Sequence, residues 1–255
     1  MTGCVIRKRI SRPLISVAVL FTAVVVCLAT MTAARADRLL PVYRVENEQR
    51  QIALTFDAAW TADDVEELIA VLARYDARAT VFAVGEWARK YPDAVRALAA
   101  AGHELGNHSD AHKHLSALDP AAFRADVAAC NETLTALTGR PVTLYRGPYG
   151  EYDNAAVAAV SDMGMTYVQW DCDSRDWMPE FTVDDILASA LRNVGPGSIL
   201  LLHIGAQHTA EALPLLLEQL KGEGYAFVTV SELLLKGKTY IDHQGCQRPA
   251  DPGKS

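Results

Sequence analysis

The segment Leu54-Thr-Phe-Asp-Ala-Ala-Trp60 joins a short apolar run to a single carboxylate, and this combination indicates the fold. The run Gln51–Phe56 has the length and composition of a buried strand. Asp57 follows it directly, and α/β folds carry their chemistry just beyond the carboxyl ends of their strands. We therefore interpret this segment as the first strand of an α/β domain, with Asp57 as a candidate functional residue.

Strand patterns and helical patterns alternate along the rest of the chain. One helix is predicted over Asp63–Arg74, and another begins at Asp119-Pro120 and ends at Gly139. Two more begin after Thr182, which starts a capping-box pattern, and near Thr209. This alternation predicts parallel βα units, and hence an α/β sheet or barrel with helices outside. The predicted strands are Gln51–Phe56, Thr80–Val84, Glu104–Asn107, Leu144–Arg146, Thr166–Trp170, Ser198–Leu202 and Ala226–Thr229.

The first 36 residues have the pattern of an export signal. A basic segment over residues 7–12 precedes an uncharged apolar run from Leu14 to about Met31, and Ala34-Arg35-Ala36 has the small-x-small pattern of a cleavage site. Cleavage after Ala36 would give a secreted, extracytoplasmic protein. The alternative is an uncleaved anchor, because the run approaches the ~20 apolar residues that span a membrane. Residues 14–34 would then provide the chain's membrane contact.

Beyond the signal peptide, the sequence predicts a single domain. Residues 37–49 form an N-terminal extension, residues 50–235 the domain itself, and residues 236–255 a polar C-terminal tail. Removing 36 of 255 residues leaves 219, which is enough for one sizeable core. The tail contains Pro and Gly, and we expect it to be mobile apart from any contact that Cys246 makes.

Charge and cysteine content narrow the range of partners and cofactors. Five of the 24 lysine and arginine residues but none of the 31 acidic ones fall in the leader, so the remainder carries 19 basic and 31 acidic residues, a net charge of −12. Such an acidic domain is a poor nucleic-acid binder. The three cysteines beyond the leader, Cys130, Cys172 and Cys246, lack metal-knuckle spacing. An oxidising compartment would allow one disulfide among them, and the pairing is open.

Polar side chains follow five of the predicted strands. Asp57, His108, Arg146 and His203 each come at a strand end, and a fifth strand runs into the acidic segment Asp171–Trp177. The carboxyl ends of parallel strands share one rim of a barrel, and active sites of α/β barrels form there. The sequence therefore predicts one site that contains all five groups.

Within this set, His108 and His112 have a spacing that suits two ligands of one metal ion. The simpler interpretation is that they are satisfied polar residues, as His114 nearby could also be. Their place on the same rim as Asp57 and His203 favours the metal interpretation. Imidazole ligands suit zinc, cobalt or nickel better than magnesium.

Two charge pairs are also predicted across this rim. Arg146 could reach the carboxylate of Asp57 through charge-assisted hydrogen bonds. Asp176 could orient His203 in the same way. Trp177 offers an aromatic face for a sugar ring, and core packing is the alternative for that side chain.

Together these segments resemble the polysaccharide deacetylase (NodB-homology) family, whose five motifs occur here in order. The resemblance extends over roughly residues 50 to 235. Five ordered motifs make a specific match, although each alone would be weak. The motifs are Thr55-Phe-Asp57, His108-Ser-x-x-His112, Arg146-x-Pro-Tyr149, Asp173-Ser-x-Asp-Trp177 and Ile199-Leu-Leu-Leu-His203.

The resemblance implies a distorted (β/α) barrel of about seven parallel strands that acts as a metal-dependent amide hydrolase. Its substrates would be N-acetylated amino sugars in peptidoglycan or chitin-like glycans, which places the protein at the cell wall. By similarity, Asp57 is the general base and is held by Arg146. His203 is the general acid and is tuned by Asp176.

The same resemblance implies how metal and substrate are bound. His108 and His112 would bind a divalent metal, with zinc the first expectation and cobalt or nickel as alternatives. The backbone N–H of Tyr149 would help to hold the oxyanion. Trp177 and Leu201 would line the pocket for the acetyl group.

The sequence departs from the family pattern at one ligand position. The usual first motif is Thr-Phe-Asp-Asp, in which the second Asp completes an Asp-His-His metal site, whereas Ala58 stands at that position here. Waters or Asp57 could complete the shell, or Asp110 or His114 could take over. Alternatively, the metal is lost and the protein is an impaired glycan binder. A milder departure is Gly147, which could loosen the loop that carries Tyr149.

A third function comes from a different enzyme class. Two rim carboxylates, Asp57 and Asp176, would suit a secreted glycosidase. That hypothesis leaves His108, His112 and His203 without a role.

Overall fold

The structure is a computed structural model, and it describes residues 38–250. The predicted leader, residues 1–36, and its alternative as an anchor over residues 14–34 lie outside the described residues. In the described part, no helix combines the length and the apolar character that a membrane crossing requires.

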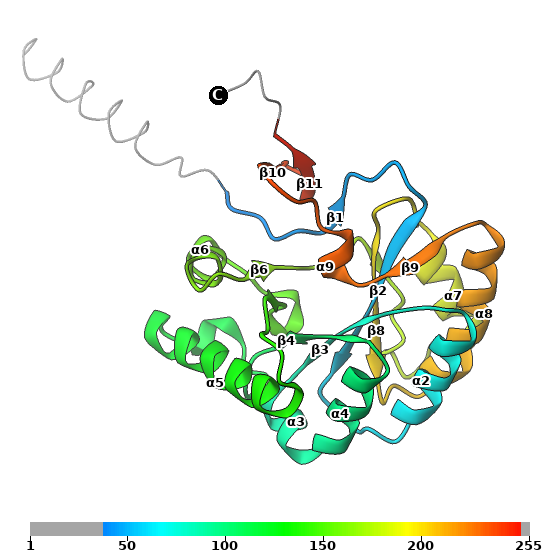
Figure 1. Cartoon of the computed structure of the whole chain (residues 1–255), viewed down its shortest axis with the longest axis horizontal. Helices are drawn as coiled ribbons and strands as arrows, with labels where there is room; N and C mark the ends of the chain where they lie inside the picture. Colours follow the sequence, from blue (N-terminus) through cyan, green and yellow to red (C-terminus); the bar gives the residue numbers. More distant parts are fainter. Residues whose placement is uncertain (1–37, 251–255) are drawn as a thin grey trace, which may run out of the picture. The chain divides into compact units, whose positions relative to one another are not determined.

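The centre of the fold is a parallel sheet that curls into a distorted barrel, as predicted (Figure 1). Along the sheet the strands lie in the order β6-β5-β4-β3-β2-β8-β7, and β9 also pairs with β2. Each predicted strand is present, and a further two-residue strand, β7, lies within the acidic segment Asp171–Trp177, where no separate strand was predicted. The strands are β2 (Gln51–Ala58), β3 (Thr80–Ala83), β4 (Glu104–Asn107), β5 (Leu144–Tyr145), β6 (Thr166–Tyr167), β7 (Cys172–Asp173), β8 (Ile199–Ile204) and β9 (Ala226–Val228).

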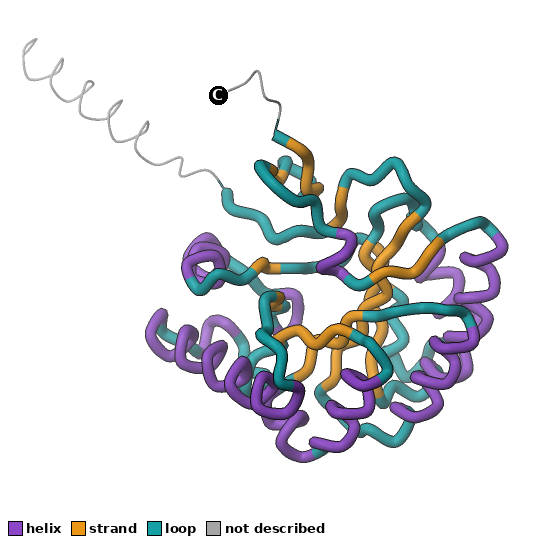
Figure 2. The backbone as a smooth tube through the Cα atoms, viewed as in Figure 1, coloured by secondary structure: helices purple, strands orange, loops and turns teal. Residues whose placement is uncertain are grey.

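Helices surround the outside of the sheet (Figure 2). Their ends agree with the signals in the sequence. Asp119 caps α5 by accepting hydrogen bonds from two backbone N–H groups, Gly139 ends that helix with φ +68°, and Thr182 forms a capping box with Asp185. The helices are α2 (Val65–Arg74), α3 (Gly85–Lys90), α4 (Pro92–Ala100), α5 (Pro120–Thr138), α6 (Asn154–Asp162), α7 (Val183–Leu191), α8 (Thr209–Gly222) and α9 (Val230–Leu233), with short 3₁₀ turns at η1 (Leu115–Ala117) and η2 (Pro148–Gly150).

The segments outside the predicted domain are not loose appendages. β1 (Arg44–Val45) pairs with β11 (Cys246–Pro249), which pairs with β10 (Thr239–Ile241) in a second sheet. The expectation that the tail from residue 236 is mobile is therefore wrong for its described part. The extension around β1 also links β6, at one end of the curled sheet, to β8, next to the strand at the other end, since Val42 pairs with Val168 beside β6 and Arg44 with Ser198 beside β8.

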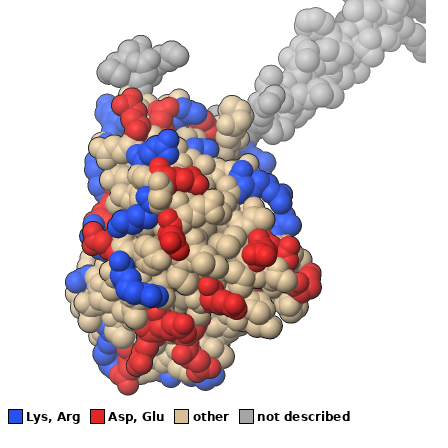
Figure 3. Space-filling view, turned by 90° about the vertical axis from the view of Figure 1, so that its right-hand side faces the viewer, with Lys and Arg blue, Asp and Glu red and all other residues tan. Residues whose placement is uncertain are grey.

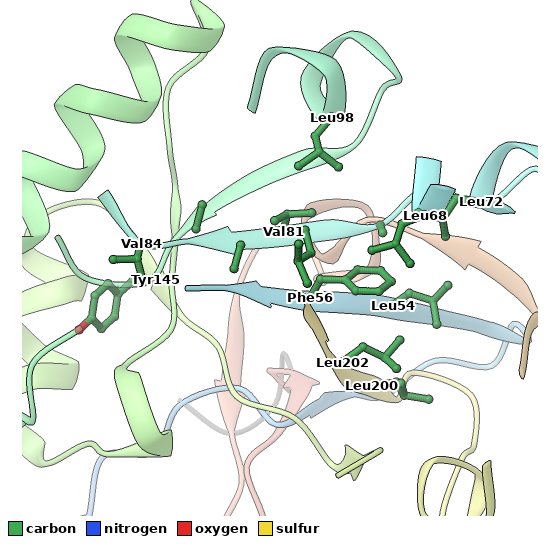
Figure 4. Close-up of a cluster of buried hydrophobic side chains, with 14 of the residues drawn as sticks. Leu54, Phe56, Leu68, Leu72, Val81, Val84, Leu98, Tyr145, Leu200 and Leu202 are labelled. Atoms are coloured by element: carbon green, nitrogen blue, oxygen red, sulfur yellow. The ribbon is translucent and has the colours of Figure 1, made fainter. Parts of the chain in front are cut away.

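Alternation along β2 separates two hydrophobic layers. Leu54 and Phe56 belong to the cluster between the sheet and the helices, where they pack with Leu68 of α2 (Figure 4). Ala53 belongs to the other cluster, with Phe82. Because side chains alternate along a strand, Asp57 lies on the same side of β2 as Ala53, which directs its carboxylate toward the barrel interior.

Cys130, Cys172 and Cys246 are buried free thiols, so the structure contains no disulfide among them. Burial raises the pKa of Cys130 and of Cys172 to about 12, which leaves both thiols uncharged. The face of the domain in Figure 3 shows acidic and basic side chains interspersed.

Candidate active site

The predicted pair between Asp57 and Arg146 is present and buried. Arg146 Nη1 donates to Asp57 Oδ1 at 2.8 Å, and its Nη2 donates to the carbonyl of Gln169 at 3.1 Å. Burial opposes ionisation of Asp57, but the charge and the hydrogen bond of Arg146 lower its pKa below the ordinary value. The carboxylate is thus ionised and held in one orientation at the end of β2.

The second predicted pair holds His203 at the end of β8. Asp176 Oδ1 lies 2.7 Å from His203 Nδ1, and Asp176 Oδ2 accepts the backbone N–H of His203, also at 2.7 Å. Burial by itself would lower the pKa of His203, but the hydrogen bond and charge of Asp176 raise it above the ordinary value. Thr209, which the sequence indicated only as a helix start, donates its hydroxyl to the same carboxylate at 2.5 Å.

His108 and His112 come from a tightly turned loop after β4. Their ring centroids are 5.0 Å apart, and Ser109 and His112 have φ values of +71° and +52°. The Asn107 side chain accepts the backbone N–H of Ser109. This left-handed turn, which the i, i+4 spacing does not specify, brings the two rings together.

The chemistry of these rings fits a bound cation. His108 Nδ1 lies 2.9 Å from the carbonyl oxygen of Arg146, which can only accept, so this nitrogen carries the proton. Burial lowers the pKa of His108, and lowers that of His112 to about 4, so both rings are neutral at pH 7. His108 Nε2 therefore turns a lone pair toward Asp57 Oδ2, 3.4 Å away. Two facing acceptors this close suit a cation between them.

Two imidazoles do not make a complete catalytic metal site, which usually has three protein ligands. Among residues 38–250, no group of three His, Cys, Asp or Glu side chains has the arrangement of a metal site. Ala58, at the position of the missing carboxylate, is completely buried. Within the described residues, the candidate metal ligands are therefore limited to the two imidazoles of His108 and His112, with the Asp57 carboxylate beside His108.

The structure also tests the two substitute ligands considered from the sequence. Asp110 is occupied, because both of its carboxylate oxygens accept from the Arg89 guanidinium, at 2.7 and 3.0 Å. His114 hydrogen-bonds to Glu151 and stacks on Tyr149, with centroids 3.9 Å apart. Neither side chain is available to a metal beside His108.

A pocket of about 620 Å³ lies above these groups. The predicted residues Tyr149, Trp177 and Leu201 line this pocket. Asp57 and His203, one residue from each charge pair, line it as well. Tyr149 and Trp177 are 58% and 50% exposed, so Trp177 is a pocket wall rather than a core residue. Five further lining residues had no individual role in the prediction from the sequence, although Asp173 belongs to the predicted acidic segment: Ala59, Trp60, Gly150, Trp170 and Asp173.

Gly147 does not loosen the loop that carries Tyr149. A Cβ at Gly147 would lie 2.1 Å from the hydroxyl of Tyr167, which donates a hydrogen bond to the carbonyl of Glu151. Close packing at this point therefore requires glycine. The loop is fixed by that contact, and Tyr149 occupies it with φ +59°.

The assembled site agrees with what the chain is similar to. The sequence profile of the polysaccharide deacetylase family matches residues 44–168. A peptidoglycan-N-acetylglucosamine deacetylase of Bacillus cereus is 32% identical over 197 residues, which cover 75% of this chain and 92% of that protein. A chitooligosaccharide deacetylase of Sinorhizobium fredii is 33% identical over 170 residues, covering 66% and 79%.

A solved structure with the same fold adds a contrast. It is that of a CE4 family pseudoenzyme from Bacillus anthracis, with a TM-score of 0.73 and 28% identity, covering 76% of this chain and 68% of that one. The similarity thus includes both deacetylases and a pseudoenzyme. On the strength of its sequence relatives, its fold and its ordered motifs, the chain belongs to the polysaccharide deacetylase family.

Proposed function

We propose that this protein is an extracytoplasmic amide hydrolase that removes N-acetyl groups from amino-sugar polymers of the peptidoglycan or chitin type. The observation that carries the proposal is the convergence of two buried charge pairs, Asp57–Arg146 and Asp176–His203, on one pocket. Buried charged groups are costly unless they are paired, and perturbed pKa values are typical of active sites.

The two pairs have complementary protonation states. Asp57 is ionised, because its lowered pKa keeps it a carboxylate, and it can accept a proton from the attacking water. His203 is favoured as the imidazolium by Asp176, and it can donate the proton that an amine leaving group requires. Arg146 and Asp176 each hold their partner in a fixed orientation, which lowers the entropic cost of reaching the transition state.

A divalent metal, with zinc as the first candidate and cobalt or nickel as alternatives, would be held by His108 and His112. Bound there, it would polarise the amide carbonyl and make a water more acidic. The neutral state of both imidazoles and the Nδ1–H of His108 leave the nitrogens ready for this role. The backbone N–H of Tyr149 is the proposed donor to the developing oxyanion.

The pocket walls suit an N-acetylated sugar. Trp177 and Tyr149 present exposed aromatic faces, and Leu201 supplies an apolar surface for the acetyl methyl group. Apolar faces with a few polar groups between them are the usual composition of a small-molecule site. Export to the cell wall, either by cleavage after Ala36 or by an anchor at residues 14–34, would bring the site to its polymer.

A second candidate function is glycan binding without turnover. Ala58 removes the third ligand of the family pattern, and among residues 38–250 no three-ligand group replaces it. The aromatic pocket would still hold a sugar. The two functions can be distinguished by their products. A deacetylase releases acetate, whereas a binding protein retains the glycan and releases nothing.

The geometry does not support the glycosidase hypothesis. The Asp176 side chain is 0% exposed, and both of its oxygens are engaged by His203 and Thr209. It therefore cannot protonate a glycosidic oxygen.

Acetate release from peptidoglycan and from chitin oligomers tests the proposal. The chain from residue 37 onward would be stripped with a chelator and then supplied with zinc or cobalt. We expect acetate only after metal is restored, with glycan length unchanged. Asp57→Asn should release none, whereas Asp93→Asn, a matched change at a surface ion pair, should behave as the wild type. A folded protein that retains glycan but releases no acetate with any metal would support the binding function instead.

A further inference from the structure

Trp60 lies flat against the ring of His203. The ring centroids are 5.2 Å apart, and the planes are inclined by only 20°. The indole is 46% exposed and forms part of the pocket wall. An exposed tryptophan packed on one functional side chain calls for an explanation, because the hydrophobic effect alone would bury it.

The loop that carries Trp60 is fastened to the end of β8. The backbone N–H of Gly205, two residues beyond His203, donates to both carboxylate oxygens of Asp64, at 2.9 and 3.1 Å. Gly205 has φ +80°, and a Cβ there would lie 2.8 Å from Thr61 Oγ1. Trp87 Nε1 also donates a hydrogen bond to the backbone carbonyl of Thr61, at 3.1 Å. These contacts fix the backbone immediately after Trp60.

Stacking on Trp60 restricts a motion of the His203 ring that its hydrogen bond to Asp176 leaves free. Asp176 holds one edge of the imidazole, through Nδ1 at 2.7 Å. A single edge contact still permits the ring to tilt about that hydrogen bond. An aromatic plane on one face opposes the tilt, and it also excludes water from that face. Nε2 then remains as the ring nitrogen free to face the pocket.

We propose that Trp60 is a positioning residue, which holds the plane of His203 in the orientation needed for proton donation. This role rests in part on the proposed function, because proton donation by His203 belongs to that function. The stacking of Trp60 on His203 does not depend on the proposed function, and it can be tested without measuring turnover.

The kinetic test compares Trp60→Phe with Trp60→Leu in the purified full chain, using chitin oligomers. Phe retains a ring that can stack, whereas Leu keeps apolar bulk without one. We expect Leu to lower kcat about tenfold with KM changed less than about threefold, since small misplacements of a reacting group are costly. Phe should restore most of kcat. A change confined to KM, or full activity in the Leu variant, would overturn the proposal, and thermal unfolding checks that both variants fold.

The spectroscopic test requires no activity. An imidazolium stacked on an indole quenches its fluorescence, so His203→Gln should brighten the protein. In the Trp60→Phe background, where Trp87, Trp170 and Trp177 remain, the same substitution should have no effect. Equal brightening in both backgrounds would show that Trp60 is not stacked on His203. Absence of acetate release from the wild type would count against the proposed function and would leave this result intact.

Discussion

Arg146 and Asp57 form a buried ion pair between the end of β5 and the end of β2. The guanidinium is 0% exposed, donates to the carboxylate at 2.8 Å, and lies over the ring of Phe82 at 4.1 Å. Its Nε has no hydrogen-bond partner in the described structure. The residue is thus held by the carboxylate, one carbonyl and an aromatic face, and the pair both orients Asp57 and supports the barrel interior.

Removing the cation should therefore destabilise the fold. Arg146→Met leaves the Asp57 carboxylate buried and unpaired, and we expect the free energy of unfolding to fall by about 3–5 kcal/mol. Urea denaturation measures this loss. The double variant Arg146→Met, Asp57→Asn should recover part of it. Arg96→Met, which breaks an exposed pair with Asp93, should cost less than about 1 kcal/mol and serves as the control.

Removing the base should lower turnover, and because Arg146 then loses its partner carboxylate, it should also lower the free energy of unfolding. Asp57→Asn preserves shape and the hydrogen bond from Arg146 but cannot accept a proton. We expect kcat/KM for acetate release to fall by at least about 10²-fold, the lower range of general acid–base contributions. Unchanged turnover in this variant would exclude Asp57 as the base.

Metal content tests the histidine pair. His108→Ala removes a neutral imidazole whose Nε2 faces the site, so zinc bound per chain after dialysis should fall well below that of the wild type. His243→Ala, an exposed change outside the pocket, should leave zinc unchanged. Equal zinc in the His108 variant and the wild type would remove His108 from the ligand set.

Ala58→Asp would introduce the carboxylate that the family pattern places beside Asp57. We expect tighter zinc binding, because the shell gains a charged third ligand. Position 58 is completely buried, so the metal-free variant should also melt at a lower temperature than the wild type. Isothermal titration and thermal unfolding with a chelator measure the two effects. Zinc affinity equal to that of the wild type would show that this position does not reach the site.

The His203–Asp176 pair predicts a specific dependence on pH. The folded pKa of His203 is raised above the ordinary 6.5. The stabilisation from its protonation is therefore fully present below pH 6.5 and is lost as the pH rises through the folded pKa. In metal-free protein, the melting-temperature advantage over His203→Gln should shrink across that window. In metal-loaded protein, kcat should decline over the same window. A difference that stays constant from about pH 5 to about pH 9 would contradict this.

The sequence alone determined the fold class and most of the candidate site. Buried strands read as short apolar runs, and helix ends carry side chains such as Asp119 and Thr182 that satisfy local backbone groups. Both patterns involve residues that are close together in the sequence, so they can be recognised without knowledge of the tertiary structure. Because parallel strands end on one rim, Asp57, Arg146 and His203 could be placed together from strand ends alone.

Tertiary structure decided what depends on contacts between distant segments. The tail pairs with β1, roughly two hundred residues earlier, through backbone hydrogen bonds that no side-chain pattern encodes. Asp110 is taken by Arg89, which removes it as a metal ligand. Trp60 reaches His203 because Gly205 can approach its loop closely. A linear sequence records which groups are available, whereas only the packed chain decides which of them meet.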